Sequence, residues 1–228
     1  MTILAACIMQ HVIGQKNNIA KCWLWKPKQG QEQNFEAGYN KHFIWRKKKG
    51  DTPVWFCWQF KSGVRYGQFL DVSFNSWKDF DISFKPDEDN ADYQHNIVPF
   101  GDLQNSFKLA YLEDLSFKDS VGLHSNYMRL ITISVNDISG ALKVIQKLKN
   151  NYSSNSVCKN FLVYKMIDGG NINQILIMLG FNNYSEYGKS ENFQEEINAI
   201  EHSFKTKVIT TVTSETLAYR PDLFIMPK

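Results

Sequence analysis

The sequence predicts an α+β protein built from two tandem copies of one β-α-β-β-α-β unit, and three observations support this. Two short blocks recur about 107 positions apart, which indicates an internal repeat in the chain of 228 residues. The apolar patterns around each block follow the same order. A composition of 43% apolar and 21% charged residues supplies a core and excludes a disordered chain.

The recurring blocks keep nearly one register. Residues 74–80 (FNSWKDF) match residues 181–187 (FNNYSEY) at an offset of 107, and the Leu-Ala-Tyr sequence at 109–111 recurs at 217–219 at an offset of 108. Two independent matches at almost equal offsets are much harder to obtain by chance than one. We therefore predict a duplicated unit.

The first unit is predicted to begin with a strand, a helix and a hairpin. Residues 19–26 are rich in β-forming residues, and residues 31–49 place apolar and aromatic side chains at helical spacing. Residues 54–61 and 67–74 are aromatic and β-branched runs, and glycines lie between them. Two such runs around a glycine-containing turn predict a β-hairpin.

A second helix and a fourth strand complete this unit in the prediction. Ser76 is a typical N-cap residue, and Asp79 three positions later resembles the acid of a capping box, so we expect a helix to begin at Trp77. Residues 85–96 contain a proline and several acids, which predicts a solvated loop. A strand is then predicted at residues 107–115.

The second unit repeats this order of elements. Its predicted elements are a strand at 129–135, a helix at 138–149, a hairpin of 161–167 and 174–181, a helix that Asn183 caps and that runs to Phe204, and a closing strand at 208–219. The predicted divisions of the chain are a truncated signal segment at 1–18, a first unit at 19–117, a linker at 118–126 and a second unit at 127–228.

Each unit has the element order of the ferredoxin-like fold, whose sheet carries helices on one face and leaves the other open. The strand at 54–61 has apolar side chains on both faces, and residues 175–179 are apolar throughout. Strands of this kind are buried on both sides. We therefore expect the two sheets to pack face to face within the one chain.

With these elements, residues 19–224 resemble the dimeric α+β barrel superfamily in a fused, two-unit form. That superfamily includes antibiotic-biosynthesis-type monooxygenases, haem-degrading monooxygenases, chlorite-dismutase-like proteins and uncharacterised exported relatives. The resemblance implies a pseudo-dimeric α+β barrel and, as one function, a monooxygenase-like or haem-dependent enzyme with haem as its cofactor. The haem-degrading members carry an Asn on the first strand, where this sequence has Cys22, Trp23 and Leu24.

The N-terminal residues bear on the compartment. Residues 1–15 resemble the end of a bacterial signal peptide, and residues 4–7 (LAAC) resemble a lipoprotein cleavage box, although no basic region precedes them. Either the natural start lies upstream or the resemblance is accidental. We favour export to the periplasm or the medium, with the cytoplasm as the alternative. The apolar run is far shorter than the roughly 20 residues that a transmembrane helix needs.

Cysteine and charge patterns exclude several classes of site. Cys22, Cys57 and Cys158 would remain after cleavage of a signal segment. They are odd in number and lack metal-ligand spacing, which indicates buried thiols and no metal centre. A net charge of +3 is too small to indicate a nucleic-acid partner, and the basic run at 46–49 complements a helix C-terminus. Phosphate-binding, zinc-protease and serine-hydrolase motifs are absent. The sequence does not indicate an oligomeric state.

Aromatic residues suggest where a ligand binds. Every tryptophan falls in the first unit, and an aromatic-lined cleft is a usual small-molecule site. Filling of the core would also use aromatic side chains, so both interpretations stay open. The tryptophans that we take as candidate ligand-binding residues are Trp23, Trp55, Trp58 and Trp77.

His42 and Tyr39 complete the candidate site. Both fall on the inward face of the first predicted helix, where an imidazole can bind a metal or move a proton. The alternative is a hydrogen-bonded core histidine. Because no convergent set of acids and bases is visible, the first hypothesis is a non-catalytic protein that binds an apolar or aromatic small molecule. The second is a monooxygenase-like or haem-dependent enzyme that uses His42 and Tyr39.

Overall fold

A computed structural model of the chain describes residues 18–119 and 122–224, so the expected signal segment at residues 1–15 lies outside the described residues. The first half contains β1 (Ile19–Pro27), α1 (Glu32–Lys49), β2 (Trp55–Phe60), β3 (Phe69–Asn75), α2 (Pro86–Asn96) and β4 (Gly101–Tyr111). The second half contains β6 (Tyr127–Val135), α3 (Ile138–Ser154), β7 (Asn160–Asp168), β8 (Gln174–Phe181), α4 (Tyr184–Gly188), α5 (Phe193–Ser203) and β9 (Ile209–Tyr219). A two-residue strand, β5 (Phe117–Lys118), lies between the halves.

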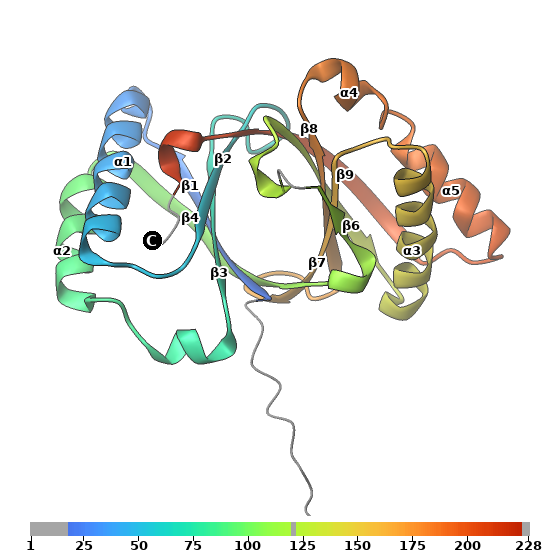
Figure 1. Cartoon of the computed structure of the whole chain (residues 1–228), viewed down its shortest axis with the longest axis horizontal. Helices are drawn as coiled ribbons and strands as arrows, with labels where there is room; N and C mark the ends of the chain where they lie inside the picture. The colour runs from blue at the N-terminus through green and yellow to red at the C-terminus, as the bar shows by residue number, and fades with distance from the viewer. Residues whose placement is uncertain (1–17, 120–121, 225–228) are drawn as a thin grey trace, which may run out of the picture.

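The strands form one closed antiparallel barrel in the order β4-β1-β3-β2-β9-β6-β8-β7, and β4 pairs with β7 to close the ring. The first half has the strand order β4-β1-β3-β2, and the second half has the matching order β9-β6-β8-β7. The helices lie outside the barrel, with α1 and α2 beside the first half and α3 and α5 beside the second (Figure 1). This architecture confirms the predicted fold of two ferredoxin-like units closed into a pseudo-dimeric α+β barrel.

Both faces of the barrel wall are buried. On β2, Phe56 and Trp58 point into the barrel, whereas Trp55 and Cys57 contact the layer under α1 and α2. The alternation arises because successive side chains of a strand face opposite sides. The second half shows the same pattern on β8, where residues 176 and 178 face the barrel interior and residues 175, 177 and 179 face the helices.

Three predicted elements differ from the structure. Residues 85–96, predicted as a loop, form α2, because Pro86 fits the first turn of a helix and the acids of that turn complement the helix dipole. The helix predicted to begin at Trp77 is the short 3₁₀ helix η1 (Trp77–Asp81). The helix predicted from Asn183 to Phe204 is broken into α4 and α5, although Asn183 does cap α4.

The fourth strand also begins earlier than predicted. β4 starts at Gly101 and ends at Tyr111, and part of the predicted strand at 107–115 forms the 3₁₀ helix η2 (Glu113–Leu115). Two further 3₁₀ helices are η3 (Gly122–His124) and η4 (Pro221–Leu223).

The two repeated blocks occupy related positions with one difference. Leu109 pairs with Ala20 and Leu217 pairs with Met128, and all four side chains face the barrel interior. Phe74 also packs toward the interior, whereas Phe181 faces the helices. A shift of one residue reverses the face of a strand residue, so the offset of 107 does not hold within β3 and β8. The duplication and the unit boundaries at 118–126 stay predictions.

Cys22, Cys57 and Cys158 are free and buried, as the sequence predicts. Within residues 18–119 and 122–224, no helix has the length and apolar character that crossing a membrane requires.

The packing of α1 on α2 depends on Gly38. A Cβ atom on Gly38 would lie 1.8 Å from the Asn96 carbonyl oxygen, which is backbone and cannot rotate away. We expect Gly38→Ala to lower the free energy of unfolding by about 2–4 kcal/mol, measured by urea denaturation. Gly188→Ala is the matched control, because its Cβ would meet nothing within 4 Å. Equal stability of the two variants would contradict this packing.

Candidate functional site

A cavity of about 460 Å³ lies in the first half, between the outer face of the barrel wall and the helices α1 and α2. Its floor is formed by β1, β2 and β3, and its walls by α1, α2 and the segment from η1 to the start of α2. This location agrees with the sequence analysis, which expects an aromatic cleft in the first unit.

The floor combines aromatic and polar side chains from neighbouring strands. Trp23 lies opposite Asp71 on β3, and Lys21 lies opposite Ser73. Ser73 also pairs with Trp55 on β2. The rings of Trp23 and Trp55 stack with centroids 4.9 Å apart and an interplanar angle of 19°, and both side chains line the cavity. Lys21 lies over the Trp23 ring at 4.5 Å and Arg46 over the Trp55 ring at 4.7 Å.

Asp71 is the acid–base group of the cavity. Its side chain is buried, and Tyr39 donates a hydrogen bond of 2.6 Å from its hydroxyl to Asp71 Oδ2. Burial raises the pKa of Asp71 to about 7, although Tyr39, Arg46 and Lys21 act in the opposite direction. Burial and the Asp71 charge also raise the pKa of Tyr39, so its hydroxyl keeps its proton. Near neutral pH the Asp71 carboxyl can therefore both accept and release a proton.

Two buried polar atoms in the cavity wall have no hydrogen-bond partner among the described residues. They are Asp71 Oδ1 and Trp25 Nε1, an acceptor and a donor. Buried polar atoms in folded proteins are almost always hydrogen-bonded, because an unpaired one costs about 1–3 kcal/mol. Asp71 and Trp25 both line the cavity, so a bound molecule that reaches past the surface of the wall would supply the missing partners.

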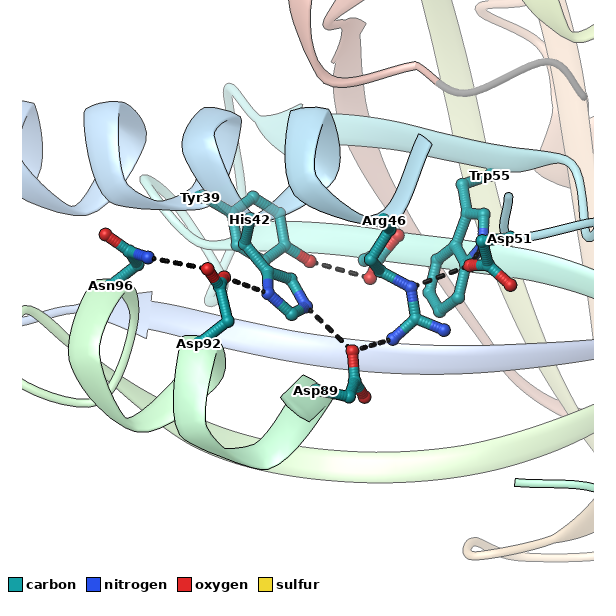
Figure 2. A network of polar contacts seen from close by, with 9 residues as sticks. Tyr39, His42, Arg46, Asp51, Trp55, Asp89, Asp92 and Asn96 are labelled. Carbon is teal, nitrogen blue, oxygen red and sulfur yellow. Dashed lines mark hydrogen bonds and ion pairs between the residues drawn. The ribbon is translucent and has the colours of Figure 1, made fainter. Parts of the chain in front are cut away.

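His42 lies at the edge of the cavity in a polar network that joins α1 to α2 (Figure 2). His42 Nδ1 is 2.7 Å from Asp92 Oδ2, and Nε2 is 3.7 Å from Asp89 Oδ1. Burial lowers the pKa of His42, so the ring is neutral near pH 7 and Nδ1 donates to Asp92. Arg46 donates to Asp89 at 2.6 Å and to the buried Asp51 at 2.7 Å.

The network extends at both ends. Asn96 donates to Asp92 at 3.1 Å, and Trp55 Nε1 donates to Asp51 at 3.0 Å, which fixes one ring of the aromatic floor. These contacts agree with the alternative of a hydrogen-bonded core histidine. His42 holds the wall of the cavity in place.

The donor set does not fit a histidine-ligated haem, the cofactor that the resemblance implies. His42 is the imidazole on the cavity wall among the described residues, and both of its nitrogens face carboxylates. An iron at Nε2 would have to displace Asp89, which Arg46 holds at 2.6 Å. The described residues also contain no group of three His, Cys, Asp or Glu side chains that could hold a metal ion.

The structure brings together four of the six predicted ligand-binding residues: Trp23, Tyr39, His42 and Trp55 line the cavity. Trp58 instead lies inside the barrel, 1% exposed, because neighbouring positions of β2 face opposite sides. Trp77 lies on η1, 53% exposed, and does not line the cavity. The ligand-binding role of the first four stays a prediction.

Sequence reasoning missed Asp71, Lys21 and Arg46. A signal for Asp71 was present, since polar residues occupy alternate positions of a strand that is otherwise apolar, at 71, 73 and 75. On a strand buried on both faces, such alternation indicates a polar surface under the helices.

Comparison with solved structures identifies the architecture. A candidate monooxygenase from Lactobacillus acidophilus is 13% identical and covers 91% of this chain and 95% of its own, with a TM-score of 0.60. A mutant chlorite dismutase from Candidatus Nitrospira defluvii is 6% identical and covers 90% and 92%, with a TM-score of 0.59. An anthrone oxidase-like protein is 10% identical and covers 90% and 92%, with a TM-score of 0.54.

The chain has the dimeric α+β barrel fold. No family model matches the sequence, and no curated protein matches it. At identities this low, the shared dimeric α+β barrel fold establishes the architecture, and function has to be argued from the cavity.

Asp71 makes the stability of this barrel depend on pH. Its pKa is about 7 in the folded protein and near 3.8 when unfolded, so the folded state binds more protons between these values. The free energy of unfolding therefore decreases as pH rises from about 4 to about 7, at up to about 1.4 kcal/mol per pH unit.

Asp71→Asn removes this dependence. Urea denaturation between pH 4.5 and 8 should show the variant gaining stability relative to the wild type as pH rises to about 7, with no further gain above it. A constant difference between the two proteins across this range would show that Asp71 titrates normally.

Haem should not bind through His42. We expect the Soret band of added haemin to be the same with the wild type and with His42→Ala, because Asp89, which Arg46 holds, lies 3.7 Å from Nε2, the nitrogen that would bind the iron. The measurement is a haemin titration followed by absorbance. A Soret shift that the wild type shows and His42→Ala loses would contradict the donor-set argument.

Proposed function

We propose that this chain is a monooxygenase-like enzyme in which Asp71 removes a proton from a flat aromatic substrate that dioxygen then oxidises. The observation that carries the proposal is the buried Asp71 carboxyl, with a pKa of about 7, on the wall of an aromatic-lined cavity. A general base is most effective when its pKa lies near the working pH.

The residues around Asp71 have different roles in the reaction. The Tyr39 hydroxyl holds Oδ2, which leaves Oδ1 to take the substrate proton. The side chains of Trp23 and Trp55 form an aromatic part of the cavity wall, against which a flat substrate can pack. The cationic side chains of Lys21 and Arg46 lie on the same wall and stabilise the anion that forms.

The step balances with dioxygen as the oxidant. A substrate methylene loses a proton to Asp71, and the resulting carbanion bonds to dioxygen to give a peroxide anion. Asp71 returns its proton to the outer oxygen, which gives a hydroperoxide. The second C–H proton then passes to Asp71 as the O–O bond breaks, which leaves the carbonyl group and a hydroxide ion. The hydroxide takes that proton from Asp71 and leaves as water, so that CH₂ and O₂ give C=O and H₂O.

Two structural neighbours support this class of reaction. One is named as a candidate monooxygenase, and the other is named anthrone oxidase-like. The non-catalytic hypothesis rested on a lack of convergent acid–base groups, and the cavity brings Asp71 and Tyr39 together. That hypothesis has lost its basis.

Oxygen consumption with anthrone as the probe substrate tests the proposal. We expect the wild type to accelerate oxygen uptake above the spontaneous rate and to yield the quinone, with a rate that rises with pH through about 7. Asp71→Asn should lower kcat by about 10²–10⁴-fold, the usual contribution of a general base. Asp102→Asn, at an exposed position of β4, is the control.

An Asp71→Asn variant with wild-type kcat would remove Asp71 from the mechanism. Wild-type protein that binds anthrone without accelerating oxygen uptake would return the chain to the class of binding proteins.

A further inference from the structure

Lys21 is a cation of the cavity that lacks an ionic partner among the described residues. It projects from β1 on the same face as Trp23 and lines the cavity. Its Nζ lies 4.5 Å from the ring centroid of Trp23 and 5.9 Å from that of Phe80. These aromatic faces hold the ammonium group without neutralising it.

The other cations nearby are paired. Arg46 contacts Asp51 at 2.7 Å and Asp89 at 2.6 Å. Lys108 Nζ lies 5.6 Å from the Phe80 ring centroid and pairs with Asp168. Asp71 and Asp89 also line the cavity, and their charges act to raise the pKa of Lys21, but neither forms an ion pair with it among the described residues. Lys21 is therefore a cation of the wall that a bound anion can contact directly.

We propose that Lys21 binds an anionic group of the substrate, and that the substrate is an aromatic carboxylate. The inference rests on the cavity of the proposed function and defines which class of aromatic compound it takes. An aromatic ring that packs in the cavity beside the Trp23 side chain can carry a carboxylate that reaches the Lys21 ammonium group over the Trp23 ring.

The sheet register places the two polar ends of such a ligand. Lys21 lies opposite Ser73, and Asp71 is two residues along β3 on the same face. Lys21 and Asp71 are thus diagonal neighbours, with their Cα atoms about 7–8 Å apart across the pair of strands. Both side chains line the cavity, so an aromatic ligand there can place its carboxylate at Lys21 while a ring proton or hydroxyl faces Asp71.

The unfavourable burial of the charged Lys21 side chain supports a role in binding. Burial, together with the Lys108 and Arg46 charges, lowers the pKa of Lys21, which means that its charged form is disfavoured where it stands. A lysine kept only for stability would pair with a carboxylate. Lys21→Met should therefore leave the melting temperature unchanged or raise it.

Calorimetric titration at pH 7 with 2-naphthoate and its neutral isostere 2-naphthamide tests the proposal. The wild type should bind the carboxylate about tenfold or more tightly than the amide, the range of one hydrogen bond to a charged group. Lys21→Met should bind the two ligands equally, and Lys21→Arg should keep the preference. Lys26→Met, on the exposed end of β1, is the matched control and should behave as the wild type.

The outcomes separate this proposal from the one on which it rests. Equal affinities of the wild type for both ligands, or a preference that survives in Lys21→Met, would overturn the anion site and leave the Asp71 chemistry standing. Absence of binding by either ligand would overturn the anion site and also the flat aromatic substrate. A lower melting temperature in Lys21→Met would show a structural lysine and contradict the proposal.

Discussion

The barrel depends on one constraint, which is that β2, β3, β7 and β8 must each bury two faces. The inner face does so by ring closure, since β2 pairs with β9 and β4 pairs with β7. An open sheet would expose the interior cluster that contains Phe56, Trp58 and Met128. The outer face is covered by helices. A cavity for a ligand can replace apolar packing on this face without breaking the strand pairs that close the ring.

The two halves use the outer face in different ways. In the second half, α3 and α5 pack on a continuous apolar surface that includes Ile131, Ile133 and Ile177. In the first half, the corresponding face carries Lys21 and Asp71, and the helices leave a cavity over it. The second half therefore contributes stability to the closed barrel, while the first half accommodates polar groups that would weaken an independent unit.

Periodicity predicted the strands well, because burial on both faces leaves a strong pattern in runs such as residues 54–61 and 175–179. It failed for α2, whose polar sequence resembles a loop. That helix is held by contacts distant in sequence, such as the bond between His42 and Asp92, which no local pattern reveals. The fold could thus be predicted from the sequence, whereas α2, the helix that encloses the site, could not.

The candidate site shows the same limit. Counting tryptophans located the correct half of the chain, yet it could not separate Trp55 from Trp58, since the face of each depends on the pairing register of β2 with β3. The alternation of polar residues in β3 marks Asp71, but its chemical role depends on a contact distant in sequence. Only the packing of α1 on β3 shows that the Tyr39 hydroxyl donates to it.

The charges of the cavity also link its two proposed roles. The positive charge of Lys21 lowers the pKa of Asp71, whereas burial raises it, and the balance lies near 7. A carboxylate bound at Lys21 would cancel the first effect, so the pKa of Asp71 would rise when such a ligand binds. Asp71 would then hold its proton more tightly in the complex than in the free protein, so the pH at which it becomes an available base would rise. The anionic group that selects the substrate would in this way also set the pH range in which Asp71 removes its proton.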